Sequence, residues 1–202
     1  LLCIDNKDYD ILDVISESVK QMSEGELLQI EKAKKLDIDE ETYFEIIKKK
    51  TASLISSCCK IAAVSVNSSS SEIKKITRIG MHIGISFQIK DDLFDYGKKT
   101  IGKPRGIDIK QKKITLPLIY TLNNINKSEK RWLIKSLKKN KKSRALINQI
   151  ISLVKERGGL DYAIQIMKKY HKLSLDDLDT FKDSSYKDSL KKMVNYVIER
   201  NY

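Results

Sequence analysis

The sequence predicts an all-α protein built as a helical bundle. Only eight glycines and two prolines interrupt 202 residues, and 33% of the residues are charged, which is typical of long helices with few turns. Apolar residues recur at helical spacing along most of the chain, and no segment shows the alternation of a half-buried strand. No break in composition, repeat or linker divides the chain, so we expect one domain over residues 1–202.

The first half of the chain predicts three long helices, over about residues 8–35, 40–66 and 71–95. Ser71 and Glu72 would open the third helix after a polar loop. In the second helix, the residues expected to form one buried stripe are Tyr43, Ile46, Ile47, Leu54, Ile55, Cys58, Ala62 and Val66. Before the first helix, the apolar run Leu1–Ile4 has no helix start signal, and an exposed run of this kind favours association with another surface.

The second half of the chain predicts shorter helices. Thr115 is a plausible N-cap with Pro117 in the first turn, so a helix is expected from there to about Leu122. Further helices are predicted over 128–139, 143–157, 160–172 and 186–200. Gly158 and Gly159 separate two of them.

The three cysteines show no disulfide or metal-binding pattern. Cys58 and Cys59 lie in an apolar helical run, which predicts small core residues in a reducing cytoplasm. No signal peptide and no run long enough to span a bilayer is found in the sequence. We therefore expect a soluble cytoplasmic protein without stable membrane insertion.

The formal net charge of +12 raises nucleic acid as a partner. However, lysines are spread along nearly every segment, and neither interleaved aromatic residues nor a helix-turn-helix signature is present. A solvated lysine-rich surface with one local basic loop is the better interpretation, and nucleic acid is not the expected partner.

The strongest functional signal is Phe87–Asp95, Phe-Gln-Ile-Lys-Asp-Asp-Leu-Phe-Asp. At 100° per residue, Gln88, Asp91, Asp92 and Asp95 fall on one face of a helix. Like charges at this spacing repel, and the end of a helix disfavours anions. Hard divalent cations need several carboxylate oxygens, and Mg²⁺ takes one or two while leaving its other positions to water and phosphate. The pattern indicates a Mg²⁺ site, although an isolated motif of this kind is more often a solvated acidic helix end.

Two flanking features favour the metal site. Gly80 and Gly84 lie upstream, where glycine costs about 1 kcal/mol each relative to alanine, so a neighbouring helix or a long apolar ligand must approach closely. Residues 96–113 form a basic loop with three glycines, one proline and seven basic residues. An acidic metal site followed directly by a cationic loop is typical of a diphosphate site.

At this point the sequence resembles the trans-isoprenyl diphosphate synthases, also called polyprenyl synthetases. Phe87–Asp95 resembles the second aspartate-rich motif of that family, and Gly102-Lys103-x-x-Gly106-x-Asp108 with Lys113–Pro117 resembles the segment after it. Upstream, Lys50-Thr51-Ala52 is similar to the family's Lys-Thr pair, and Gly25-Glu26-x-x-Gln29 to its Glu-Gly-Glu helix. The four motifs occur in family order and imply an isoprenoid synthase-type helical bundle.

The resemblance implies a Mg²⁺-dependent prenyltransferase that joins isopentenyl diphosphate to an allylic diphosphate. Asp91 would bind the metal directly, and Asp92 and Asp95 would bind it through water or support it. Lys50, Lys103 and Lys113 would hold the allylic diphosphate. Thr51 and Gln88 would direct oxygen dipoles toward the allylic carbon and assist proton removal. Phe87 would form a wall of the substrate pocket.

The resemblance also implies parts that these 202 residues do not contain. The family's first aspartate-rich motif and its isopentenyl diphosphate-binding residues belong upstream of Leu1. The expectation is therefore the C-terminal part of a longer synthase, lacking its N-terminal helices and inactive alone. The run Thr115–Ile119 is more like medium or long chain synthases, such as octaprenyl diphosphate synthases, than short chain ones. The family implies a homodimer.

Two other functions remain open at this stage. One is a noncatalytic or regulatory prenyl synthase subunit, and the other a basic helical protein that binds nucleic acid; a terpene cyclase is disfavoured by Lys50-Thr51. A second acidic cluster, Asp176-Asp177-Leu178-Asp179, has no basic loop after it and is interpreted as a solvated turn. His82 and His171 are far apart in sequence, and each is expected to be structural.

Overall fold

The computed structural model describes residues 1–35, 39–97 and 105–200, and within these ranges every regular element is a helix. The first half contains α1 (Leu2–Asp5), α2 (Tyr9–Lys35), α3 (Glu40–Ile47), the π-helix η1 (Lys48–Ala52), α4 (Ser53–Ser65) and α5 (Ser70–Phe94). The second half contains α6 (Ile107–Lys110), α7 (Leu116–Asn124), α8 (Lys127–Lys138), α9 (Arg144–Glu156), α10 (Gly159–Asp179) and α11 (Ser185–Glu199). The predicted all-α fold is confirmed.

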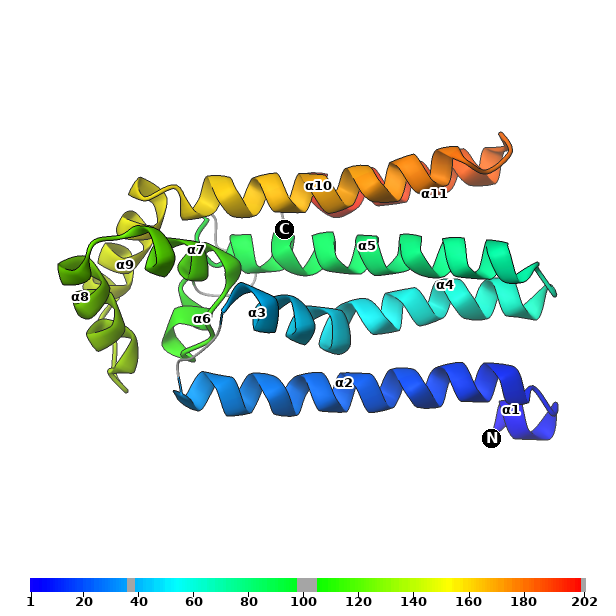
Figure 1. Ribbon diagram of the computed structural model, residues 1–202, viewed down its shortest axis with the longest axis horizontal. Coiled ribbons are helices and arrows are strands. Elements are labelled where there is room, and N and C mark those ends of the chain that lie inside the picture. Colours follow the sequence, from blue (N-terminus) through cyan, green and yellow to red (C-terminus); the bar gives the residue numbers. More distant parts are fainter. Residues whose placement is uncertain (36–38, 98–104, 201–202) are drawn as a thin grey trace.

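Helix α5 is the centre of the bundle. It packs against α4 and η1 on one side and against α10 and α11 on the other, while α2 forms an outer layer against α4 and η1. Figure 1 shows these long helices running side by side, with α6–α9 gathered at the end opposite the N-terminus. The end of α5 that carries the aspartates therefore points toward the α6–α9 end of the molecule.

The start of α5 is fixed by a capping box. The Ser69 hydroxyl accepts a hydrogen bond from the Glu72 backbone N–H, and the Glu72 carboxylate accepts one from the Ser69 N–H. This reciprocal pairing satisfies two donors that a helix start leaves without partners. The helix therefore begins at Ser70, one residue before the predicted Ser71.

The glycines of α5 let two helices approach closely. A Cβ atom on Gly84 would lie 2.4 Å from the Ala52 Cα, and one on Gly80 would lie 2.8 Å from the Ser56 Cα. Both distances are shorter than any ordinary carbon–carbon contact, so only glycine fits. The sequence left open whether a neighbouring helix or a long apolar ligand approaches these glycines. In the structure a helix occupies this space.

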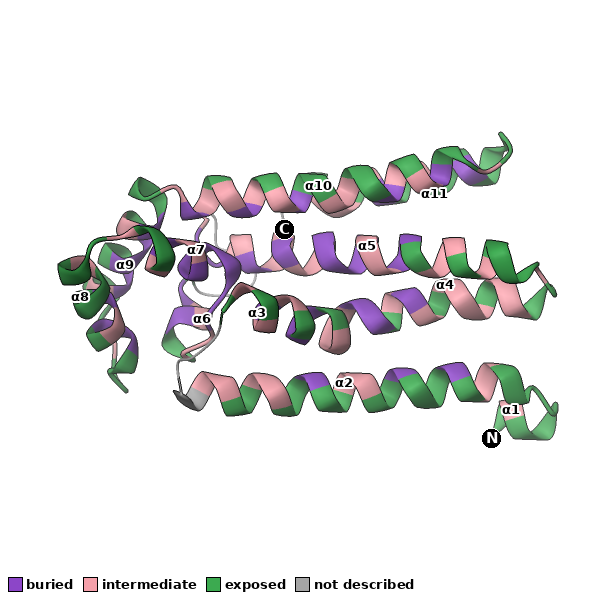
Figure 2. Cartoon of the chain, in the orientation of Figure 1, coloured by how far each residue is buried: buried purple, intermediate pink, exposed green. Residues whose placement is uncertain are grey.

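The segment predicted as one helix over 40–66 is broken by the π-helix η1. A π turn adds one residue to the helical repeat, which rotates the following helix by about 100°. The stripe predicted from 3.6-residue spacing is therefore correct only before η1. Tyr43, Ile46 and Ile47 are buried and Ile55 is half-buried, whereas Leu54, Cys58, Ala62 and Val66 are exposed. Figure 2 shows this change from buried to exposed positions along α4.

Cys58 is thus not the core residue that the sequence predicted, while Cys59 is partly buried against Gly80. The buried positions at the end of η1 and the start of α4 are Ala52, Ser53 and Ser56, and Ala52 and Ser56 face α5 at the close approach. The change in register also moves Lys50 and Thr51 away from the positions that a continuous α-helix would give them.

The shorter helices largely follow the sequence prediction. α8, α9 and α11 agree with it to within about a residue at each end, a normal tolerance for helix boundaries. Thr115 precedes α7, but its hydroxyl makes no capping bond and instead lies 2.8 Å from the Tyr96 hydroxyl. The short α6 was not predicted, and α10 continues seven residues beyond its predicted end at 172.

The main core lies between α5, α7, α8, α9 and α10. Its fully buried members include Ile89, Leu118, Leu133, Ile150 and Val154. None of the helices in the described ranges combines the length and the apolar character needed to cross a membrane.

Candidate active site

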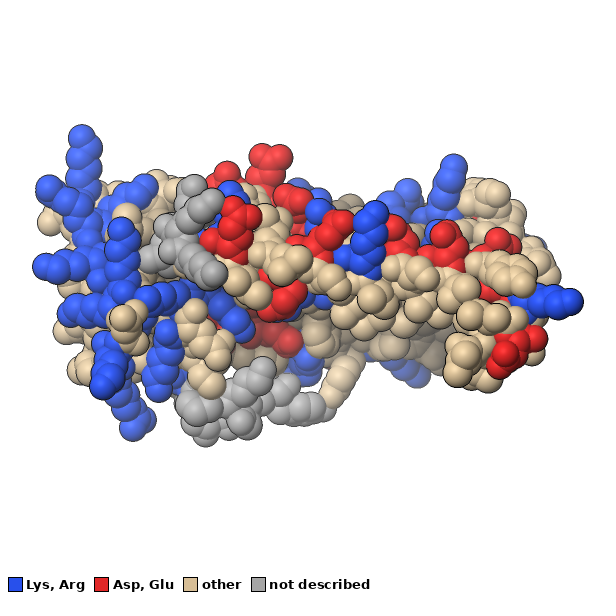
Figure 3. All heavy atoms as spheres, turned by 90° about the horizontal axis from the view of Figure 1, so that it is seen from below, with Lys and Arg blue, Asp and Glu red and all other residues tan. Residues whose placement is uncertain are grey.

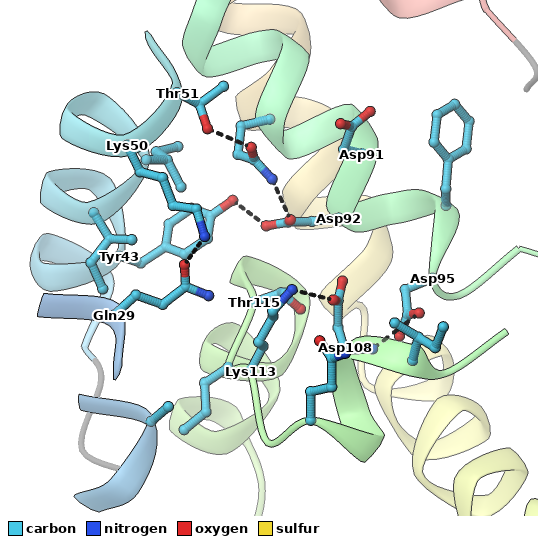
Figure 4. Close-up of a pocket in the computed structure, with 18 of the residues that line it drawn as sticks. Gln29, Tyr43, Lys50, Thr51, Asp91, Asp92, Asp95, Asp108, Lys113 and Thr115 are labelled. Carbon is cyan, nitrogen blue, oxygen red and sulfur yellow. Dashed lines mark hydrogen bonds and ion pairs between the residues drawn. The ribbon is translucent and has the colours of Figure 1, made fainter. Parts of the chain in front are cut away.

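A cavity of about 600 Å³ opens between α2, α3, η1, the end of α5 and α6. Figure 4 shows its polar side chains arranged around a common space. The side chains named from the sequence that line it are Lys50, Thr51, Gln88, Asp91, Asp92, Asp95 and Lys113. Residues separated by more than sixty positions in the chain are therefore brought to one site, at the end of the bundle where α6 begins.

Asp92 is the most deeply buried carboxylate of the cavity. Its Oδ2 accepts a hydrogen bond of 2.7 Å from the Tyr43 hydroxyl, and its Oδ1 accepts one of 2.9 Å from the Gln88 amide. Burial raises the pKa of Asp92 to about 7, even though both hydrogen bonds act to lower it. Burial, and next the Asp92 charge, raise the pKa of Tyr43, so this hydroxyl stays a donor.

Gln88 is held at both ends of its amide. The Thr51 hydroxyl donates to the Gln88 Oε1 at 2.8 Å, while the Gln88 nitrogen donates to Asp92. The chain Thr51–Gln88–Asp92 therefore joins η1 to α5 across the cavity. It fixes the orientation of the amide, which sequence alone leaves undetermined.

Asp95 has one satisfied and one unsatisfied oxygen. Its Oδ1 accepts from the Asp108 backbone N–H at 3.3 Å, whereas its buried Oδ2 has no hydrogen-bond partner in the part of the chain that the structure describes. Burial, and then the Asp108 charge, raise the pKa of Asp95. A buried carboxylate oxygen without a partner is costly unless a cation or water satisfies it.

Asp91 is the more accessible carboxylate, with 39% of its side chain exposed. It contacts the guanidinium of Arg200, which follows α11. Arg200 also donates to the Phe87 carbonyl oxygen at 3.1 Å, and its guanidinium lies 3.9 Å from the centre of the Phe87 ring. Phe87 was expected to line the cavity but does not, because its ring faces Arg200; the aromatic side chains that line it are Tyr43 and Phe94.

Lys50 is held by α2 rather than left in solvent. Its ammonium donates to the Gln29 Oε1 at 2.7 Å and pairs with Glu26 at 2.5 Å. Glu26 and Gln29 belong to the segment that resembles the Glu-Gly-Glu helix. Gly25 allows this approach, since a Cβ there would lie 2.7 Å from the Lys50 backbone nitrogen.

The opposite wall of the cavity comes from the segment after α5. Lys113 donates to the Asp108 Oδ1 at 3.2 Å, and Arg105 also lines the cavity. Lys103, another residue named for the diphosphate, lies outside the described residues. Gly106, in the left-handed region with φ of 77°, turns the chain into α6 and places Asp108 beside Asp95.

The donor set fits a magnesium ion that retains other ligands. No group of three His, Cys, Asp or Glu side chains in the described ranges converges into a complete metal cage. Mg²⁺ binds through one or two carboxylates and completes its shell with water and substrate phosphates. The unsatisfied Asp95 oxygen and the accessible Asp91 are suited to such a partial site.

Sequence reasoning missed several residues that line or support the cavity. They are Tyr43, Arg105 and Arg200, while Gln29 and Asp108 were noted only within motifs. Tyr43 was assigned to an apolar stripe because periodicity does not show where a hydroxyl points. Arg200 is 109 residues from Asp91 and carried no local signal.

The second acidic cluster lies elsewhere and is neutralised. Asp177 accepts two hydrogen bonds from the Arg78 guanidinium, at 2.6 and 2.8 Å. Its segment is the last turn of α10, so the predicted solvated turn is wrong. His82 Nδ1 lies 3.7 Å from Asp177, and His171 bonds to Asn195 at 2.9 Å. Neither histidine lines the cavity.

Comparison with known proteins identifies the family. The polyprenyl synthetase family model matches residues 2–154. This chain belongs to the polyprenyl synthetase family. The geranylgeranyl diphosphate synthase of Saccharolobus solfataricus is 29% identical over 199 residues, covering 96% of this chain and 60% of the relative. The octaprenyl diphosphate synthase of Haemophilus influenzae is 27% identical, covering 95% and 59%.

Solved structures of polyprenyl synthetases share the fold. A geranylgeranyl pyrophosphate synthase from Bacteroides thetaiotaomicron is 35% identical with a TM-score of 0.88, covering 95% of this chain and 64% of that chain. A decaprenyl diphosphate synthase from Rhodobacter capsulatus has a TM-score of 0.91 at 26% identity, covering 100% and 62%. The chain thus spans about three fifths of the length of these relatives.

Proposed function

We propose that this polyprenyl synthetase chain carries the second aspartate-rich half of a Mg²⁺-dependent prenyltransferase site. The reaction proposed is condensation of isopentenyl diphosphate with an allylic diphosphate. The observation that carries the proposal is the cavity itself, in which Asp91, Asp92 and Asp95 of α5 face the cations Lys50 and Lys113. A site with carboxylates for a cation and lysines for phosphate oxygens is suited to a metal-bound diphosphate.

In this proposal each side chain has an electrostatic or positioning role. The aspartates would hold Mg²⁺, which would supply Lewis acid chemistry to the leaving diphosphate. Lys50, Lys113 and, outside the described residues, Lys103 neutralise the diphosphate oxygens. Because the lysines are already oriented by Gln29 and Asp108, little reorganisation is needed as charge develops on the leaving group.

The proposed reaction consists of one substitution at the allylic carbon and the loss of one proton. The allylic carbon–oxygen bond breaks, and its electron pair leaves with the diphosphate. The double bond of isopentenyl diphosphate supplies the electrons of the new carbon–carbon bond, and loss of a proton restores a double bond. Thr51 and Gln88 are proposed to lie beside the cationic carbon, where their oxygen dipoles stabilise positive charge.

The full reaction requires more than these 202 residues, on this proposal. They contain one aspartate-rich motif of the two that the resemblance implies. We expect the chain alone to bind an allylic diphosphate and to give no turnover, whereas a longer polypeptide that includes the upstream motif transfers prenyl groups. A noncatalytic or regulatory subunit is the second candidate, favoured by the single motif, and absence of turnover in the longer polypeptide would support it.

The direct test is calorimetric titration of the chain with farnesyl diphosphate, with and without Mg²⁺. Farnesol, which has the same apolar chain but no diphosphate, is the matched ligand. We expect heat of binding only for farnesyl diphosphate with Mg²⁺. Binding of equal strength without Mg²⁺, or equal binding of farnesol, would contradict the proposed metal–diphosphate site.

A further inference from the structure

The net positive charge of the protein is concentrated on one hairpin. Residues 127–157 are 31 of the 202 residues, yet they hold eleven of the 39 Lys and Arg and two of the 27 Asp and Glu. This segment therefore carries nine of the twelve net positive charges. It consists of α8, α9 and their connection. Figure 3 shows the basic side chains gathered at this end of the molecule.

We define the basic face as the exposed Lys and Arg side chains of this hairpin. They are Lys127, Lys130, Arg131, Lys135, Lys138, Lys139, Lys141, Arg144, Lys155 and Arg157. Arg157 pairs with Glu129, but within the described chain no carboxylate lies at ion-pair distance from the other nine. Nine cations on one small surface are therefore left for an external partner or for solvent.

The arrangement is unfavourable for the isolated helix. Lys127, Arg131 and Lys135 follow one another at i,i+4 along α8, where like charges repel. The buried face of the same helix is ordinary, with Leu133 and Leu137 in the core. Packing therefore accounts for the inner face of the hairpin and leaves the outer face unexplained.

The hairpin is also rigidly connected to the candidate active site. Ile147 of α9 packs directly on Gly106 at the start of α6, where an added Cβ would lie 2.3 Å from the Ile147 side chain. Ile107 and Asp108, the next residues, line the cavity. A partner bound to the basic face would thus lie at the same end of the bundle as the cavity.

We propose that the basic face is a docking surface for an anionic lipid bilayer. Clustered Lys and Arg side chains are attracted to acidic headgroups at a membrane surface. Trp132 follows Arg131 on α8 and is 39% exposed, and tryptophan favours the headgroup level of a bilayer. No helix inserts across the bilayer in this arrangement; the protein lies on it through electrostatic contact.

Nucleic acid is the competing polyanion, and the surface favours lipid over it. Single strands are bound by several aromatic platforms interleaved with basic residues, whereas Trp132 is the only aromatic residue in 127–157. The choice of lipid also rests on the proposed function, because a growing prenyl chain is lipid-soluble. Docking at the surface would bring the cavity near the phase into which such a product partitions.

The experiment compares vesicle binding of three proteins in the absence of any diphosphate substrate. The basic-face variant combines Lys130→Glu, Lys135→Glu, Lys138→Glu and Lys141→Glu. Its control carries the same charge change on exposed residues of α10 and α11, namely Lys168→Glu, Lys169→Glu, Lys172→Glu and Lys192→Glu. Far-ultraviolet circular dichroism and urea unfolding establish that all three proteins are folded.

We expect the unaltered chain to co-sediment with vesicles of phosphatidylcholine and phosphatidylglycerol, to be released by high salt, and not to sediment with phosphatidylcholine alone. The basic-face variant should bind the anionic vesicles at least about tenfold more weakly, and the control should lose much less. Trp132 is the only tryptophan of the chain, so its emission should shift to shorter wavelength on binding.

Three results would overturn the proposal: equal loss of binding in the two variants, vesicle binding with no change in Trp132 emission, or tighter binding of an oligonucleotide than of anionic vesicles at the same salt. The vesicle experiment tests the basic face separately from the diphosphate site in the cavity. Failure of vesicle binding leaves Mg²⁺-dependent diphosphate binding intact, and failure of diphosphate binding leaves the charge of the basic face unchanged.

Discussion

Two acidic clusters of similar composition lie at the ends of the two longest core helices, and they have opposite environments. Asp91, Asp92 and Asp95 end α5 at a cavity, where burial raises the pKa of Asp92 and Asp95. Asp177 ends α10 beside Arg78, which lowers its pKa. Asp91 pairs with Arg200, whereas Asp92 and Asp95 are buried with no Lys or Arg at ion-pair distance in the described part of the chain. The α5 cluster is therefore distinguished by two carboxylates buried away from cations, rather than by the number of acids.

The largest expected effect is an opposite pH dependence of stability at the two clusters. The folded pKa of Asp92 is raised to about 7, so its contribution is present at low pH and is lost as pH rises from about 4 to about 7. Without Mg²⁺, the unaltered chain should lose on the order of 2–4 kcal/mol of unfolding free energy over that pH range. The Asp92→Asn variant should not show this loss. Urea unfolding of both proteins at several pH values measures it.

For Asp177 the sign is reversed. Its pKa is lowered by Arg78, so its contribution is present at neutral pH and is lost as pH falls through the folded pKa. Asp177→Asn should therefore reduce the stability difference between neutral and acidic pH. If Asp92→Asn and Asp177→Asn changed the pH dependence of stability in the same direction, the contrast between the two clusters would be contradicted.

The next effect concerns the close approach that builds the α5 site. Gly84→Ala would place a Cβ 2.4 Å from the Ala52 Cα, and we expect it to destabilise the fold by about 1–3 kcal/mol through overpacking. Gly97→Ala is the matched control, since its nearest contact would be 3.3 Å, to the Phe94 carbonyl oxygen. Unfolding midpoints in urea compare them, and equal changes would argue against a tight α5–η1 contact.

A smaller effect is expected from Tyr43→Phe, which removes the hydrogen bond to Asp92 Oδ2. Loss of this buried hydrogen bond should cost about 1–2 kcal/mol, and Mg²⁺-dependent diphosphate binding should weaken about tenfold. Tyr162→Phe is the control, because that hydroxyl also donates to a carboxylate, Glu40, but at 2.6 Å outside the cavity. The unfolding free energy of the Tyr162→Phe variant can change, whereas its affinity for the diphosphate should not.

The smallest effect is expected at the α10 cluster. Arg78 has 56% of its side chain exposed, and ion pairs at such surfaces contribute about 0–1 kcal/mol. Arg78→Ala should therefore lower the unfolding free energy by less than about 1 kcal/mol and leave diphosphate binding unchanged. A loss of binding similar to that of Tyr43→Phe would mean that the clusters are coupled.

Much of the fold and of the cavity could be predicted from sequence because the signals are local. The spacing of Gln88, Asp91, Asp92 and Asp95 is a property of one helix, and Gly84 is informative because a glycine within a helix needs a nearby backbone. These residues do line one cavity or form one close contact in the structure.

The remaining features depend on long-range contacts or on irregular backbone. The π-helix η1 lies in close contact with Gly25 of α2 and Gly84 of α5, and no periodicity in 40–66 reveals it. The orientation of Tyr43 toward Asp92 joins residues 49 positions apart. The resemblance implied that Phe87 is a wall of the substrate pocket, whereas its ring faces Arg200, a residue that carried no signal in the local sequence.

The central claim is that the end of α5, and not the end of α10, holds a metal-bound diphosphate. Calorimetric titration of farnesyl diphosphate with Mg²⁺ into Asp91→Asn and Asp177→Asn tests it most directly, because each change removes one carboxylate charge. We expect Asp91→Asn to weaken binding by at least about tenfold and Asp177→Asn to bind as the unaltered chain does. Equal affinities of the two variants would contradict the account.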